Sequence, residues 1–109
     1  MTPAQQLREA LVLSAEARQA LAAGDGARAA PLRRAAASAL ADAANGYRHA
    51  LGADAPSLFV VHALAIAACR AAGLADRATA LRDACAHTPW FPELLARVGD
   101  GTASPPEVE

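Results

Sequence analysis

The chain of 109 residues contains 33 alanines and ten arginines but no lysine, and it carries eleven carboxylates. Its formal charge of −1 excludes a protein held to nucleic acid or anionic lipid by bulk charge, since such proteins need a surplus of basic side chains. Two cysteines are too few for a disulfide scaffold, and no apolar run reaches the roughly 20 residues of a membrane span, so we expect a soluble cytoplasmic protein.

The composition favours helix along nearly the whole chain. Alanine loses no side-chain rotamer freedom in a helix, and the β-branched residues that favour strands are few. Because alanine buries little apolar area, the predicted core is tightly packed but only modestly stabilised. Such a chain gains stability from a partner, either another protein or a second copy of itself. We therefore predict an all-α protein.

The first predicted helix covers residues 3–23 and opens a hairpin that extends to residue 51. Pro3 is suited to a first helical turn after Thr2 as N-cap, and Gly24 ends the helix. Residues at helical spacing form one stripe along it: Leu7, Leu11, Ser14, Arg18 and Leu21.

The second predicted helix begins after Asp25 and completes the hairpin. Its stripe consists of Leu32, Ala36, Leu40, Ala43, Tyr47 and Leu51. The stripe stays in register across Gly46, so we expect the helix to continue through this glycine. Pro31 lies early enough to be a kink in the first turns or to mark the true start of the helix.

A second hairpin is predicted over residues 56–88. Its first helix starts after Ser57 and ends at Gly73, and it is apolar nearly all round. Such a helix is typical of a central position, covered by neighbours on more than one face. Its second helix is expected from about residue 75 to His87, because the residue before Pro89 resists the helical region.

A short helix over residues 92–98 is predicted to end a single domain of residues 1–98, with residues 99–109 as a flexible tail. Trp90 and Phe91 are adjacent large aromatics that precede this helix. Two interpretations of the pair are open. They either cap the end of the core or are exposed as an anchor for a partner, since aromatics dominate binding hot spots.

The chain contains an internal repeat. A shift of 49 positions aligns two copies of the pattern AAGxxxRAxxLRxAxA, identical at nine of sixteen positions. The matches that do not involve alanine are Gly24/Gly73, Arg28/Arg77, Leu32/Leu81 and Arg33/Arg82. The pattern indicates a helix that ends in glycine, a tight turn and a second helix, so we expect two stacked antiparallel hairpins plus the short C-terminal helix.

This pattern resembles a tetratricopeptide-like repeat, in which a turn glycine is followed five residues later by a small residue. Gly24 with Ala29, and Gly73 with Ala78, match it, although the period of 49 differs from the usual value of about 34. The resemblance implies a right-handed array, with a four-helix bundle as the alternative. It also implies a groove lined by the first helix of each hairpin, at Leu11, Ser14, Arg18, Val60, Leu64 and Arg70. In the alternative interpretation, these leucines and Val60 are ordinary core and the arginines are solvated.

Histidines and cysteines are the candidates for a metal or a reactive thiol. In an antiparallel hairpin that turns at Gly73, His62 pairs with Cys85, while Cys69 falls roughly 10 Å out of step, too far for a disulfide. His62 and Cys85 could hold a soft metal or a small ligand. The absence of a fourth ligand and of paired metal-binding spacings favours a buried thiol beside a hydrogen-bonded core histidine. We therefore predict no metal and no cofactor.

The sequence predicts a non-catalytic protein–protein interaction module, such as an adaptor or a small chaperone or assembly factor. It lacks a nucleophile elbow, a phosphate-binding loop and paired carboxylates, so no enzyme is expected. The alternative is a homodimeric helical bundle in which the apolar third helix pairs with its own copy. The candidate partner-binding residues are the six groove residues together with Trp90 and Phe91.

Overall fold

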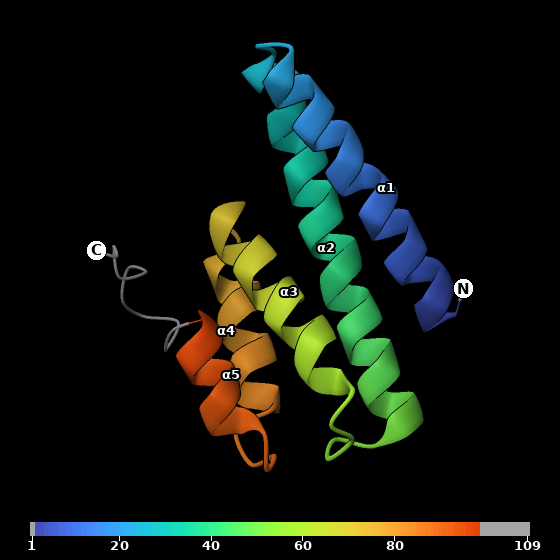
Figure 1. The fold of residues 1–109 in the computed structure, drawn as a ribbon, viewed down its shortest axis with the longest axis vertical. Coiled ribbons are helices and arrows are strands. Elements are labelled where there is room, and N and C mark those ends of the chain that lie inside the picture. Colours follow the sequence, from blue (N-terminus) through green and yellow to red (C-terminus); the bar gives the residue numbers. More distant parts are fainter. Residues whose placement is uncertain (1, 99–109) are drawn as a thin grey trace.

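The computed structural model describes residues 2–98, which form helices and contain no strand (Figure 1). This confirms the predicted all-α fold, whereas the predicted tail of residues 99–109 lies outside the described part. The helices are α1 (Pro3–Ala22), α2 (Gly26–Leu51), α3 (Leu58–Ala71), α4 (Ala75–Ala84) and α5 (Phe91–Val98).

The helices form two stacked antiparallel hairpins, as predicted. α1 and α2 make a long hairpin, α3 and α4 make a shorter one, and α5 packs beside α3 (Figure 1). α2 joins the two hairpins, because α1 lies along one side of it and α3 along another. Among the described helices, α1 lies beside α2 alone and does not approach α3. This separation of α1 from α3 is the feature that creates the candidate site.

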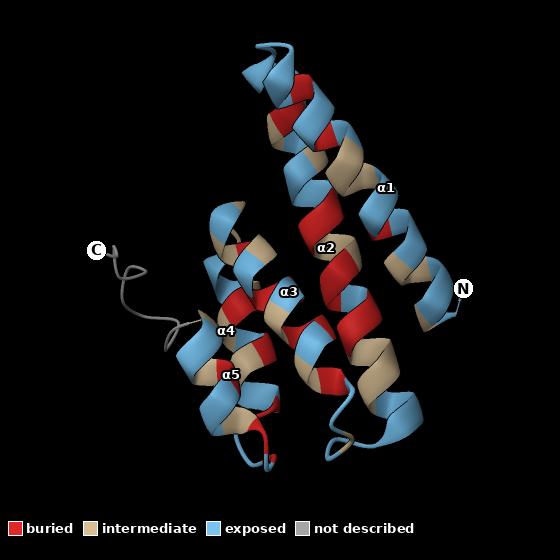
Figure 2. Ribbon diagram, in the orientation of Figure 1, coloured by how far each residue is buried: buried red, intermediate tan, exposed pale blue. Residues whose placement is uncertain are grey.

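The α1–α2 interface is built from small side chains. Its buried residues are Ala10, Ala17 and Ala20 from α1 and alanines of α2 that include Ala29 and Ala36. Alanine allows two helices to approach closely but buries little apolar surface. Figure 2 shows the result: buried residues concentrate around α2 and its neighbours α3 and α4, while much of α1 is exposed.

α2 is continuous through Pro31 and Gly46, the two positions at which its sequence could interrupt a helix. Pro31 lies inside the helix, which begins at Gly26, with the Asp25 carboxylate accepting from the Arg28 N–H at 3.1 Å as N-cap. Gly46 lies near its other end, where an added Cβ would be 2.9 Å from Cγ of Pro3. Contacts that short require something to shift, so the glycine at position 46 lets the start of α1 lie directly on α2.

The two hairpin turns have the same backbone geometry. Gly24 and Gly73 both have φ of +81°, a left-handed conformation that glycine adopts without a steric penalty. The residue after each glycine donates its N–H to the carbonyl five residues before, from Asp25 to Ala20 at 2.8 Å and from Leu74 to Cys69 at 2.7 Å. This is the hydrogen bond that closes a helix in a Schellman motif. The segments aligned by the internal repeat therefore share their turn structure.

Four predicted helix boundaries differ from the structure. α1 ends at Ala22, one residue earlier than predicted. α3 ends at Ala71, just before the glycine turn. α4 ends at Ala84 rather than near His87, because the chain then turns and the Thr88 hydroxyl donates to the Cys85 carbonyl at 2.8 Å. α5 begins at Phe91, one residue earlier than predicted, and Pro92 is its second residue.

α3 is the most apolar helix, and it is covered on only part of its circumference. α2, α4 and α5 all pack against it, which confirms its predicted central position. They bury side chains that include Ile66, of which 1% is exposed. On its remaining face, however, Val60 is 60% exposed and Leu64 is 49% exposed. α3 therefore presents a bare apolar face next to α2.

Candidate functional site

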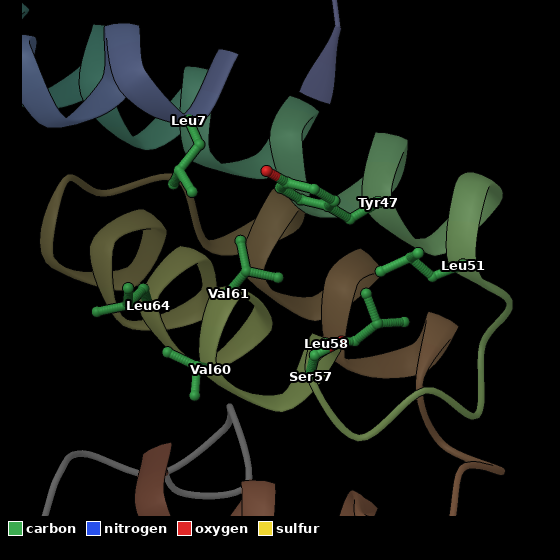
Figure 3. Close-up of a pocket in the computed structure, with 8 residues that line it drawn as sticks. All are labelled: Leu7, Tyr47, Leu51, Ser57, Leu58, Val60, Val61 and Leu64. Atoms are coloured by element: carbon green, nitrogen blue, oxygen red, sulfur yellow. The ribbon is translucent and has the colours of Figure 1, made fainter. Parts of the chain in front are cut away.

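A groove lies between α1 and α3, and α2 forms its floor. We call it the α1–α3 groove. One half of it, the apolar half, has a volume of about 260 Å³ (Figure 3). Its lining consists of Leu7, Tyr47, Leu51, Ser57, Leu58, Val60, Val61 and Leu64. In Figure 3, Leu7 from α1 and Tyr47 from α2 point toward Val61 of α3, so all three helices contribute to this half.

The groove continues toward the α1–α2 turn in a second hollow of about 280 Å³, which we call the arginine half. Its lining consists of Ser14, Ala17, Arg18, Leu21, Arg33, Ala36, Ala68 and Ala71. Because α1 and α3 run in the same direction, residue numbers rise along both walls from the apolar half to the arginine half (Figure 1). The floor residues run the opposite way, from Leu51 and Tyr47 to Arg33.

Large aliphatic side chains are exposed along this groove. Leu21, Leu51, Val60 and Leu64 all line it and are about half in water. Leu11 is similarly exposed and lies on α1 between the lining residues Leu7 and Ser14. The interpretation of Leu11, Val60 and Leu64 as ordinary core is therefore wrong, because no helix in residues 2–98 covers them. Clustered exposed aliphatic side chains are uncommon on monomeric proteins and mark interaction surfaces.

The charged side chains of the lining are both cationic. Among residues 2–98, Arg18 and Arg33 form no ion pair, and no carboxylate lines either half of the groove. Arg33 donates to the Ala71 carbonyl at 3.5 Å, which spans the gap between α2 and α3. The groove thus has an apolar half and a positively charged half.

Four of the six predicted groove residues line the groove: Ser14, Arg18, Val60 and Leu64. Arg70 does not, because its side chain lies on the α5 side of α3 and donates to the Val98 carbonyl. The prediction missed the floor, which α2 supplies through Tyr47, Leu51 and Arg33. Tyr47 and Leu51 belong to the apolar stripe predicted on α2, but periodicity alone does not show which part of a stripe is left uncovered.

The interpretation of Trp90 as an exposed anchor is wrong. The turn after α4 brings Trp90 back against α3, where it is buried. Its ring packs edge-on against Phe59, with 6.4 Å between ring centroids, and lies 5.6 Å from the His62 ring. Phe91 is half-buried and packs against the same core. These aromatics therefore close the end of the core that α3, α4 and α5 share.

His62 is a hydrogen-bonded core histidine. Its Nδ1 donates to the Leu58 carbonyl at 3.1 Å, so its Nε2 is left to accept from Nη1 of Arg48 at 3.2 Å. This arrangement requires the neutral ring. Burial lowers the pKa of His62, and the Arg48 cation lowers it further, while the hydrogen bond to Leu58 acts in the opposite direction. Nδ1 carries the proton and the lone pair of Nε2 accepts from Arg48, so no ring lone pair is left for a ligand.

Both thiols are free and buried. Cys85 Sγ donates to the Leu81 carbonyl at 3.2 Å, and burial raises the pKa of this thiol to about 11, with Arg48 opposing the rise. Burial also raises the pKa of Cys69. A thiol is nucleophilic as the thiolate, so these two are poorly reactive at neutral pH. In the part of the chain that the structure describes, no three His, Cys, Asp or Glu side chains are grouped to hold a metal ion.

Comparisons of the chain with protein-family models, with curated proteins and with solved structures found no match. The tetratricopeptide-like resemblance therefore stays a prediction from the sequence pattern. None of the helices within residues 2–98 has the combination of length and apolar character needed to cross a bilayer. The proposals below depend on the geometry and chemistry of the α1–α3 groove.

Proposed function

We propose that this chain is a non-catalytic interaction module that binds an apolar segment of another protein in the α1–α3 groove, as an adaptor or assembly factor does. The observation that carries the proposal is the row of half-exposed aliphatic side chains along a preformed groove. Fully burying one such side chain contributes roughly 1.5–3 kcal/mol, so covering the exposed halves of four of them contributes roughly 4 kcal/mol before the cost of association.

The electrostatics of the other candidate site, formed by His62 and Cys85, support a non-catalytic role. His62 is held neutral between two hydrogen bonds, and the Cys85 thiol is held protonated by burial. A general base or nucleophile would need a pKa near the working pH and access to a substrate. Neither side chain offers both, so the groove is the better candidate for the function.

Site-specific photo-crosslinking in cells that naturally produce this protein tests the proposal. A photoreactive amino acid is placed at position 64, inside the groove, and in a matched protein at position 12. Val12 is also exposed and apolar, but it lies on α1 outside the groove lining. We expect a discrete adduct with another protein from position 64 and none from position 12.

Two results would contradict the proposal. Equal adducts from both positions would mean that any exposed apolar residue of this chain captures proteins. Adducts of the chain with itself alone, together with a dimeric mass by light scattering over a tenfold concentration range, would mean that a second copy covers the groove, as in the homodimeric alternative.

A further inference from the structure

The first three helices occupy three corners of a four-helix arrangement. α1 and α3 each lie beside α2 but not beside one another, and both contribute side chains to the hollows above α2. In a four-helix bundle, two helices at diagonal corners are likewise kept apart, and each of them contacts both of the other two helices. A helix laid in the α1–α3 groove would therefore contact α1 and α3 and complete the bundle.

The chemistry of the groove walls favours a helix over an extended segment. The walls are faces of helices, whose backbone groups are already hydrogen-bonded within each helix, so the groove offers no sheet edge. An extended segment buried there would leave its own N–H and C=O groups without partners, whereas a helix satisfies them internally. Small side chains let a helical backbone come close in the arginine half, namely Ser14, Ala17, Ala36, Ala68 and Ala71.

The geometry points to an amphipathic helix with carboxylates at one end as the partner segment, an inference that rests on the proposed function. Arg18 and Arg33 are exposed at one end of the groove, and neither has a carboxylate partner within residues 2–98. An Asp or Glu of the partner would supply the missing counter-charge, while a Lys or Arg in its place would be repelled.

The distance between the apolar half and the arginine half determines how far apart the apolar and acidic residues of the partner helix must lie. Leu7 and Arg18 are eleven residues apart on α1, which corresponds to about 16 Å at 1.5 Å per residue. The apolar anchors of the partner would fill the space beside Leu51, Val60 and Leu64. Its carboxylates would then follow about three helical turns away, beside the two arginines.

Binding of synthetic peptides to the full chain tests the inference. The probe is a fluorescent helical peptide with leucines at i, i+4 and i+7 and two glutamates about three turns beyond them. The matched control peptide carries two glutamines instead. Both are titrated by fluorescence anisotropy against the unmodified protein, the double variant Arg18→Gln/Arg33→Gln, and Leu64→Asp. The three substituted residues are exposed, and circular dichroism confirms that each variant remains helical.

We expect the glutamate peptide to bind about fivefold more tightly than the glutamine peptide at low salt, as for two solvent-accessible ion pairs. This preference should shrink as salt is added and disappear in the double arginine variant. Leu64→Asp should weaken both peptides alike. Equal binding of the two peptides to the unmodified protein would overturn the inference.

The failures of the two proposals are distinguishable. If both peptides bind equally and Leu64→Asp abolishes their binding, the groove binds helices without selecting charge. The inference about carboxylates then fails, while the proposed function is still supported. If neither peptide binds but position 64 crosslinks to a protein, the partner is not a helix of this kind. If neither peptide binds and no crosslink forms, both proposals fail.

Discussion

Leu64 and Ile66 are aliphatic residues two positions apart on α3, and they point to opposite sides of the helix. Ile66 is 1% exposed and Leu64 is 49% exposed. Truncation of a buried isoleucine loses its transfer free energy and leaves a cavity, so we expect Ile66→Ala to lower the free energy of unfolding by about 2–5 kcal/mol. Leu64 has half of its surface in water and leaves no enclosed cavity, so Leu64→Ala should cost about 1 kcal/mol or less.

Urea unfolding followed by far-UV circular dichroism measures both losses. If Ile66→Ala is already unfolded without urea, Ile66→Val takes its place, with an expected cost of about 0.5–1.5 kcal/mol. Equal losses for the two alanine variants would refute an open groove, since Leu64 would then be covered in the isolated protein. A loss for Leu64→Ala that grows with protein concentration would identify a second copy as the cover.

Three further predictions follow from individual contacts. Gly46→Ala adds about 1 kcal/mol of helix propensity. Because its Cβ would meet Cγ of Pro3 at 2.9 Å, we expect thermal unfolding to show a net loss of stability, and this loss should be smaller when Pro3→Ala removes that Cγ. Because the pKa of His62 is lowered from 6.5 in the folded state, the unfolded chain takes up a proton that the folded chain does not. The free energy of unfolding should therefore be highest above pH 6.5 and fall as the pH drops below it, and urea unfolding should show a smaller fall for His62→Gln. The Cys85 thiol, with its pKa raised from 9.0 to about 11, should stay protonated until well above pH 9.0, and stability should decline as the pH rises from 9.0 toward 11; rapid labelling of the native protein by an aromatic disulfide reagent would contradict its burial.

The positions of the helices could be predicted because their ends carry local signals. Gly24 and Gly73 mark the two hairpin turns, and the structure places a left-handed glycine at each. The early end of α4 could not be predicted in this way, since it depends on how Thr88 and Trp90 fold back onto the rest of the domain. Local signals show where a helix can stop, while tertiary packing decides where it does stop.

The candidate site could be predicted only in part, for a related reason. The stripe on α1 and the likeness of the two hairpins indicated Arg18, Val60 and Leu64. α3, however, is apolar nearly all round, so its periodicity does not show that Val60 is exposed while the adjacent Val61 is buried. That difference arises because α1 rests on α2 and stays away from α3, an arrangement set by packing rather than by periodicity.

The attachment of α1 has a consequence for the dynamics of the groove. α1 packs against α2 alone, and the buried residues of α1 are all alanines, whereas α3 buries larger side chains such as Leu58 and Ile66. We therefore expect less apolar burial to hold α1 in place than holds α3. Regions held in this way open with a free energy below that of global unfolding. Amide protons of α1 should therefore exchange with solvent faster than those of α3, and a bound partner should slow them. If exchange shows this difference, α1 is the less stable of the two walls of the α1–α3 groove.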